Sequence, residues 1–230
     1  KVYFKGRSAK GISKKNTVTR LLKILDNKKL LNNQKFEIKI TKNIPHKSGM
    51  GGGSMNAASL INFFIIKKMI KLKKNELSKL TKSIGSDVIL GVKPKNVILS
   101  SNGKVKKYNI KPKFYTLVVK PNFGCSTKYI YSNVSRFKKS EFNYPKKLMF
   151  KSEYLSGLKN QLEEVAFYKY PKLKKIKLFL KSIQNPLFVR MTGSGSVIVA
   201  YYQSKKDCEK AKVQFKRKFK NYWCNVSKTI

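Results

Sequence analysis

A glycine-rich segment near residue 50 has the residue types of a phosphate-binding loop. Four of the five residues from 49 to 53 are glycines, and an apolar run that begins at Ala57 follows them. Glycines let the backbone approach a ligand, and a helix N-terminus behind them directs several N–H groups at one point. Ser54 and Asn56 add oxygens that suit helix capping or contact with the Mg²⁺ of a nucleotide. The segment predicts a phosphate cradle; glycines that serve helix packing alone are the alternative.

Two further clusters have residue types that suit phosphoryl transfer. Asp87, one of ten acidic residues in the chain, lies between a glycine turn and an apolar run, where a carboxylate can accept or orient the proton of a substrate hydroxyl. A turn or helix-capping aspartate is the alternative. Gly193, Ser194 and Gly195 lie between two strand-like runs, and a plain hairpin would have the same residues. Neither the Walker spacing nor Gly-x-Gly-x-x-Gly occurs at these positions.

The composition is that of a globular protein with an extreme basic charge. The net charge is +43, which suits a polyanionic partner such as RNA. Lysine outnumbers arginine by 48 to 5, however, and the lysines are spread from end to end. Readers of phosphates and bases favour the bidentate fork of arginine. This pattern indicates the lysine bias of an AT-rich genome and no specific nucleic-acid partner.

Cysteine, histidine and hydropathy patterns indicate a cytoplasmic protein without structural zinc or a membrane span. Three cysteines without CxxC spacing and a single histidine, His46, fit neither a zinc site nor a disulfide framework. The longest apolar run, residues 60–66, is too short to cross a bilayer, and no signal peptide is visible. The chain begins at Lys1 in a strand-like run, so we expect that it lacks its natural start.

Periodicity predicts α+β elements that position these clusters. Strands are expected over residues 2–4, 36–40, 114–120, 188–191, 197–202 and 222–226, with a hairpin of residues 96–100 and 104–109 that turns at Asn102-Gly103. Helices are expected over residues 16–31, 57–70, 76–83, 127–134, 162–168, 172–183 and 207–218. Residues 145–159 are expected to form a lysine-rich, partly flexible connection. We place the boundary between two domains after residue 111, giving domains 1–111 and 112–230.

The glycine segment resembles motif two of the GHMP kinase superfamily, Pro-x-x-x-Gly-Leu-Gly-Gly-Gly-Ser-Ser-x-Ala-Ala. The matching residues are Pro45, Gly49, Gly51, Gly52, Gly53, Ser54, Ala57 and Ala58. Met50 and Met55 replace a usual Leu and Ser, and Lys47 replaces a small residue. Met191-Thr192-Gly193-Ser194-Gly195 resembles motif three of the same superfamily, which lies near the phosphates and the substrate.

Further segments resemble one family within it, the 4-diphosphocytidyl-2-C-methylerythritol kinases. The segment around Gly85-Ser86-Asp87-Val88 resembles its Leu-Gly-Ala-Asp-Val-Pro motif, with Ile89 in place of the usual proline, which implies that Asp87 is the catalytic carboxylate. Asn16 begins a segment similar to Asn-Leu-Val-x-Arg-Ala, whose Asn lies near the nucleotide base. Residues 121–131 resemble Pro-x-x-x-x-Ser-Thr-x-x-x-Tyr/Phe, which places Thr127 and Tyr131 in the cytidine pocket. Asn160-Gln161-Leu162-Glu163, followed by Tyr170-Pro171, resembles Asn-Asp-Leu-Glu … Tyr-Pro.

The resemblance implies a two-domain α+β kinase. Its first domain would be similar to ribosomal protein S5 domain 2 and its second ferredoxin-like, with the active site between them. ATP would bind along Gly49–Ser54 with Mg²⁺ near Ser54, and Gly193–Gly195 would contact the substrate. The implied reaction phosphorylates the 2-hydroxyl of a diphosphocytidyl methylerythritol in the non-mevalonate isoprenoid pathway, by a monomer or homodimer without a membrane partner.

One part of the family pattern is missing, and two rivals stay open. The motif Pro-Ala-Lys-x-Asn and a later Gly-Tyr-His, which supply a catalytic lysine and a cytosine-contacting histidine, would precede the residues present; Lys10, in Ser8-Ala9-Lys10-Gly11, is a superficial match only. A homoserine or mevalonate type of GHMP kinase would share motifs two and three. A basic RNA-binding protein with an S5-like fold would share the charge.

Overall fold

The computed structural model describes residues 1–93, 95–110, 112–137 and 139–229. The chain forms two compact units: unit 1 is Lys1–Ile44 with Gly51–Val97, and unit 2 is Pro45–Met50 with Ile98–Ile230. The glycine segment therefore passes from unit 2 into unit 1 between Met50 and Gly51. The predicted domain boundary falls at residue 111, which lies outside the described residues, as does residue 230; this boundary stays a prediction.

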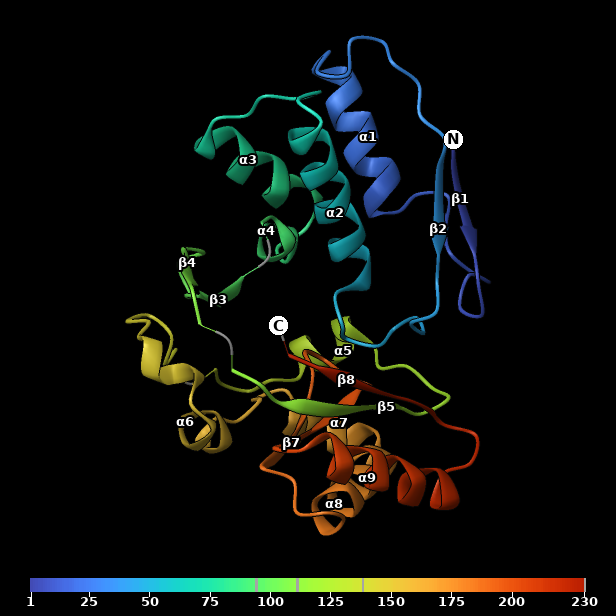
Figure 1. Cartoon of the computed structure of the whole chain (residues 1–230), viewed down its shortest axis with the longest axis vertical. Helices are drawn as coiled ribbons and strands as arrows, with labels where there is room; N and C mark the ends of the chain where they lie inside the picture. The colour runs from blue at the N-terminus through green and yellow to red at the C-terminus, as the bar shows by residue number, and fades with distance from the viewer. Residues whose placement is uncertain (94, 111, 138, 230) are drawn as a thin grey trace. The chain divides into compact units, whose positions relative to one another are not determined.

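The described residues of unit 1 form a parallel strand pair and four helices. Strands β1 (Val2–Lys5) and β2 (Ile38–Thr41) pair in parallel, with Val2 opposite Ile38. A parallel pair needs a crossover connection, and helix α1 (Thr17–Asn27) lies within it. Helices α2 (Gly52–Ile66), α3 (Lys74–Ile84) and α4 (Val88–Gly91) follow (Figure 1).

The helices of unit 1 enclose its apolar core. In α1, Leu21 and Leu25 are one turn apart and fully buried, and in α2 Ile61 and Phe64 are buried as well. The ring of Phe36 packs edge-on against Phe64, with ring centroids 5.1 Å apart. Burial of these side chains fixes α2 against its neighbours, so the glycines at the N-terminus of α2 have a fixed position in unit 1.

Unit 2 contains an antiparallel sheet of four strands. The strands β5 (Tyr115–Lys120), β6 (Phe188–Met191), β7 (Ile198–Tyr202) and β8 (Trp223–Lys228) lie in the order β6-β7-β5-β8. Val118 of β5 lies opposite Val199 of β7 and Asn225 of β8. With helices between β5 and β6 and between β7 and β8, this is the βαββαβ order of a ferredoxin-like domain, as expected.

Six helical segments accompany this sheet. Their bounds are α5 (Thr127–Ser132), the 3₁₀ helix η1 (Lys147–Phe150), α6 (Ser152–Gly157), α7 (Glu163–Lys169), α8 (Pro171–Ser182) and α9 (Lys205–Lys218). Helices α8 and α9 pack on the sheet, where Leu173, Ile176 and Phe215 join its core. In Figure 1 they lie together on one side of β5 and β8. Val118 and Val199 form a second, smaller apolar cluster with Met50.

The structure corrects three expectations about elements. Helix α2 begins at Gly52 and not at Ala57, because the turn at Gly51 lets the next two glycines enter the first helical turn. Residues 145–159, expected as a partly flexible connection, contain the helices η1 and α6. The four-residue helix α4 is too short to show a helical period in the sequence. The expected hairpin, formed by β3 (Asn96–Leu99) and β4 (Val105–Tyr108) with Gly103 at φ 76°, is confirmed.

Candidate active site

The first turn of α2 in unit 1 is open to a ligand. Gly51 is its N-cap residue at φ 63° and ψ 18°, a left-handed conformation that favours glycine. Among the described residues no side chain caps this helix, so the first N–H groups of the helix lack partners within it. A Cβ placed on Gly51 would meet nothing within 4 Å. The side-chain amine of Lys42 lies 3.0 Å from the position of a Cβ on Gly52, and burial lowers the pKa of Lys42. Open N–H groups beside an amine fit a phosphate.

Asp87 lies on the loop that packs beside this turn, also within unit 1. The carboxylate is exposed at the N-terminus of α4, and its Oδ1 accepts a hydrogen bond of 3.1 Å from Ser86 Oγ. A Cβ on Gly85, two residues before Asp87, would lie 3.8 Å from Ser54 Oγ. The structure therefore brings the Asp87 loop and Ser54 together, two features that are more than 30 residues apart in the sequence.

A tight contact between α4 and α2 fixes this arrangement. A Cβ on Gly91 would lie 2.7 Å from Ala58 Cβ and 2.8 Å from Met55 Sδ, so only glycine fits there. Asn62 Nδ2 donates a hydrogen bond of 2.9 Å to the Gly91 carbonyl oxygen. The position of Asp87 relative to the start of α2 thus rests on backbone packing as well as on the loop.

Asn16, predicted near the nucleotide base, caps α1 in the structure. Its Oδ1 accepts hydrogen bonds from the backbone N–H groups of Val18 (3.0 Å) and Thr19 (3.2 Å). The next residue, Thr17, donates from Oγ1 to the Gly53 carbonyl oxygen at 2.8 Å. Contact with the base stays a prediction for Asn16. Thr17, which is not among the predicted site residues, is the residue that links α1 to the glycine turn.

In unit 2, the first part of the glycine segment lies against motif three. Thr192 Oγ1 donates a hydrogen bond of 2.5 Å to the Gly49 carbonyl oxygen, and the N–H of Val197 donates to the Ser48 carbonyl oxygen at 3.2 Å. Gly49 has φ 70°, and a Cβ there would lie 2.5 Å from the Thr192 carbonyl oxygen and 2.8 Å from that of Gly195. Only glycine fits this crossing. Pro45 begins the short segment of unit 2 that contains Gly49.

Thr127 and Tyr131, predicted to line the cytidine pocket, both lie on α5. The hydroxyls of Thr127 and Ser194 are 2.8 Å apart, so α5 begins beside motif three. Tyr131 lies one turn later with its side chain 51% exposed, and its ring is 6.3 Å from that of Phe137. Thr127, Ser194 and the Gly193–Gly195 turn thus lie together in unit 2, while the Tyr131 ring faces solvent.

Two residues outside the predicted set hold motif three in place. Asn160 Nδ2 donates to the carbonyl oxygens of Met191 (2.9 Å) and Gly193 (2.8 Å). Glu163 Oε1 accepts from the Met191 N–H at 2.7 Å, and Glu163 Oε2 pairs with Lys177 Nζ at 2.5 Å. The resemblance to Asn-Asp-Leu-Glu was the only sequence signal for this pair, and it gave no contact partner.

Three further features of the described residues concern metal ligands, membrane spans and thiols. No cluster of three or more His, Cys, Asp or Glu side chains forms a metal cage among them. Within the same residues, no helix has the length and apolar character that a membrane span requires. Burial raises the pKa of the Cys125 thiol to about 11 and that of Cys208 to about 12, which keeps both thiols protonated.

Comparison with known proteins identifies two family domains. The model of the GHMP kinases N terminal domain matches residues 16–103, and the model of the GHMP kinases C terminal domain matches residues 134–221. Together they cover more than half of the chain. The first match includes Gly51–Ser54 and Asp87, and the second includes motif three.

Curated relatives and solved structures agree with these domains. The chain is 64% identical over 230 residues to the 4-diphosphocytidyl-2-C-methyl-D-erythritol kinase of Pelagibacter ubique, covering 100% of this chain and 82% of the relative. It is 30% identical over 174 residues to the kinase of that name from Petrotoga mobilis, covering 72% of this chain and 67% of the relative.

Two solved structures show the same fold at low sequence identity. A crystal structure of 4-(cytidine 5'-diphospho)-2C-methyl-D-erythritol kinase has a TM-score of 0.72 at 20% identity, covering 97% of this chain and 81% of the other. A homoserine kinase from Cytophaga hutchinsonii has a TM-score of 0.71 at 18% identity, covering 100% and 82%. The fold alone therefore does not separate the two types of kinase. The 64% identity to the Pelagibacter ubique kinase does separate them. The chain belongs to the GHMP kinases and, within them, to the 4-diphosphocytidyl-2-C-methyl-D-erythritol kinase family.

Proposed function

We propose that this kinase transfers the γ-phosphoryl group of ATP to the 2-hydroxyl of 4-(cytidine 5'-diphospho)-2-C-methyl-D-erythritol, a step of the non-mevalonate isoprenoid pathway. The observation that carries the proposal is the 64% identity over the whole chain to a curated kinase of that name. Use of ATP follows from membership of a kinase family.

The first turn of α2 has the role of a phosphate cradle in this proposal. The backbone N–H groups of Gly52, Gly53 and Ser54 donate to phosphate oxygens, and the open space at Gly51 leaves room for them. The amine of Lys42 adds positive charge beside Gly52. Phosphoryl transfer depends chiefly on positioning and charge stabilisation, so fixed donors of this kind are what the reaction requires.

Asp87 has the role of orienting the acceptor hydroxyl and receiving its proton. Its exposed carboxylate and its place on the loop beside Ser54 support this role. Ser54 Oγ is the proposed protein ligand of Mg²⁺, which would neutralise charge on the phosphates when bound.

The substrate-binding roles in unit 2 fall to α5 and motif three. Thr127 would hydrogen-bond the cytidine moiety, and the exposed ring of Tyr131 offers a face on which cytosine can stack. The Gly193–Gly195 turn would contact the substrate, and Pro45 and Gly49 would shape the start of the phosphate loop. Asn16 would support the base from the start of α1. We expect a cytoplasmic monomer or homodimer with no specific nucleic-acid partner.

A panel of acceptors tests this proposal. ADP release is measured with 4-(cytidine 5'-diphospho)-2-C-methyl-D-erythritol, homoserine and mevalonate at equal concentrations. We expect turnover with the first compound and background rates with the other two. Faster ADP release with homoserine or mevalonate would contradict the assignment of the substrate while leaving the family intact.

A further inference from the structure

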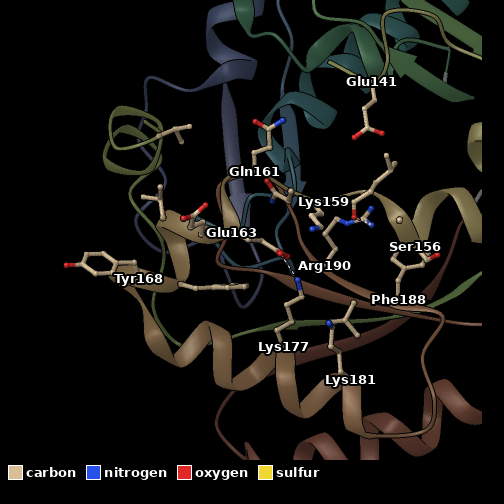
Figure 2. A pocket seen from close by; sticks show the side chains of 18 of the residues that line it. Glu141, Ser156, Lys159, Gln161, Glu163, Tyr168, Lys177, Lys181, Phe188 and Arg190 are labelled. Atoms are coloured by element: carbon tan, nitrogen blue, oxygen red, sulfur yellow. Dashed lines mark hydrogen bonds and ion pairs between the residues drawn. The ribbon is translucent and has the colours of Figure 1, made fainter. Parts of the chain in front are cut away.

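A hollow of about 1230 Å³ lies within unit 2, and its lining does not include the residues proposed to bind substrate and phosphate. Its wall comes from the end of α6, the link to α7, α7 itself, α8, β6, and α5 with the segment after it (Figure 2). None of the residues Pro45–Met50, Thr127, Tyr131 or 192–195 is among those described as lining it. We call this space the α6–α7 hollow.

Positive charge in this hollow is only partly neutralised. Arg190 is half-buried, and its Nη2 donates to the carbonyl oxygens of Leu155 and Leu158, at 2.5 and 2.6 Å. Among the described residues no carboxylate lies within ion-pair distance of Arg190. Glu163, which also lines the hollow, has both oxygens engaged by Met191 and Lys177. Burial lowers the pKa of Arg190, with smaller opposing contributions from Tyr201 and Glu163.

Two lysines extend this positive surface. Lys159 and Lys181 line the hollow with exposed side chains, and Figure 2 shows Lys159 and Arg190 projecting into the same central region. The acidic side chains on the wall are Glu141, Glu163 and Glu164, against the cations Arg136, Lys159, Lys177, Lys181 and Arg190. The wall therefore carries a net positive charge even after its own acids are counted.

The choice of arginine is informative in this chain. Only five of its 53 basic residues are arginines, and two of them, Arg136 and Arg190, line this one hollow. An arginine differs from the common lysine in the planar fork of its guanidinium, which can donate two parallel hydrogen bonds to one anion. Within the described part of the chain Arg190 donates only from Nη2, whereas a guanidinium has five donors, so the N–H groups of Nε and Nη1 have no protein partner there. A fork with lysines beside it is the usual way to bind phosphate.

We propose that the α6–α7 hollow is a second binding site, for a small phosphorylated molecule whose phosphate is held by Arg190, Lys159 and Lys181. The hollow is large enough for a whole metabolite. Its occupant would also touch Asn160 and Glu163, the two residues that hold Met191 and Gly193. A ligand there is therefore coupled to the position of motif three, and this regulatory consequence rests on the proposed function.

Calorimetric titration with pyrophosphate tests the site directly. The protein is first saturated with a non-hydrolysable ATP analogue, so that the glycine turn of α2 does not compete for the probe. The test variant is Lys159→Gln with Lys181→Gln, two exposed side chains whose removal leaves the core untouched. The control variant is Lys174→Gln with Lys210→Gln, two exposed lysines of unit 2 outside the hollow. Both variants lose the same charge.

We expect one pyrophosphate per chain to bind the saturated wild type, and the Lys159/Lys181 variant to bind about tenfold more weakly. The Lys174/Lys210 variant should bind within about twofold of wild type, since distant exposed charges are screened at physiological salt. Arg190→Lys, which keeps the charge and loses the fork, should also weaken binding. No binding to the saturated wild type, or equal loss in both double variants, would overturn the proposal, because either result would leave only unspecific attraction to a basic protein.

This design separates the further site from the proposed function. If the ATP analogue does not bind, the proposed function is wrong. The comparison of the two double variants still decides whether the hollow binds pyrophosphate specifically. If the analogue binds and pyrophosphate does not, the proposed second binding site is wrong and the proposed function is unaffected. For the coupling, pyrophosphate should change the KM for the acceptor in wild type and not in the Lys159/Lys181 variant; an equal change in both would overturn it.

Discussion

The side-chain hydroxyl of Thr192 donates a hydrogen bond of 2.5 Å to the backbone carbonyl oxygen of Gly49. This bond joins motif three to the first part of the phosphate loop within unit 2, across 143 residues of sequence. We predict that Thr192→Val lowers kcat/KM about fivefold, because the loss of one such hydrogen bond costs about 1 kcal/mol. Steady-state kinetics measure the effect. Thr192→Ser keeps the hydroxyl and should retain the rate; an equal loss in both variants would contradict this role.

Two glycines of the phosphate loop should respond differently to alanine. Both Gly49 and Gly51 have positive φ, but a Cβ on Gly49 would clash with two backbone oxygens, whereas one on Gly51 would meet nothing within 4 Å. We predict that Gly49→Ala lowers the free energy of unfolding by about 3 kcal/mol and Gly51→Ala by about 1 kcal/mol. Urea denaturation separates the two.

Enzyme kinetics add a second readout for the same pair. The methyl group of Gly51→Ala points into the open space that the phosphates would occupy, so the KM for ATP should rise although the fold is retained. If Gly51→Ala instead left the KM for ATP unchanged, the first turn of α2 would not be the phosphate cradle.

The ion pair between Glu163 and Lys177 should stabilise unit 2. Both side chains are largely buried, with 13% and 18% exposed, and Glu163 also accepts from the Met191 N–H. Glu163→Ala removes the carboxylate partner of Lys177 and the acceptor of that N–H, so we predict a loss of about 3 kcal/mol in the free energy of unfolding. The matched control is Glu37→Ala, which breaks the exposed pair with Lys39 and should cost less than about 1 kcal/mol. Equal losses of unfolding free energy for Glu163→Ala and Glu37→Ala in urea denaturation would contradict a stabilising role for the Glu163–Lys177 pair.

The buried thiol of Cys208 should make stability fall at alkaline pH. Burial raises the pKa of Cys208 to about 12, whereas a thiol in the unfolded chain titrates near about 8.5. Between these values the folded protein retains a proton that the unfolded chain loses, so the free energy of unfolding decreases as pH rises. We predict a steeper decrease between pH about 8.5 and about 10.5 for wild type than for Cys208→Ala. Parallel curves would show that the thiol does not contribute.

Much of the fold follows from local sequence signals. The strands of unit 2 are predicted within a few residues because they are short runs rich in β-branched and aromatic residues, and helices α8 and α9 because their apolar spacing extends over three turns or more. The predicted start of α2 is wrong by five residues, because glycine has a low helix propensity. The left-handed turn at Gly51, which the sequence does not show, explains why the helix begins at Gly52. Helix α4 is missed because four residues show no period.

The candidate site is less predictable, because its contacts join distant parts of the chain. The sequence alone predicts Gly51–Ser54, Asp87 and motif three as separate clusters. Three contacts depend on tertiary packing. They are the approach of Gly85 to Ser54 and the hydrogen bonds from Thr17 to Gly53 and from Asn160 to Gly193. Lys42 is one of many lysines, and only its partial burial beside Gly52 distinguishes it from the rest.

The role of Asp87 is the most direct test of the proposed kinase site. The measurement is the rate of ATP-dependent phosphorylation of 4-(cytidine 5'-diphospho)-2-C-methyl-D-erythritol by wild type, Asp87→Asn and Asp26→Asn, with unfolding curves for all three. Asp26 is an exposed carboxylate of α1 in the same unit and is the matched control. We predict that Asp87→Asn lowers kcat at least about a hundredfold without loss of stability, while Asp26→Asn retains the wild-type rate. A wild-type kcat for Asp87→Asn would contradict the proposed role of Asp87.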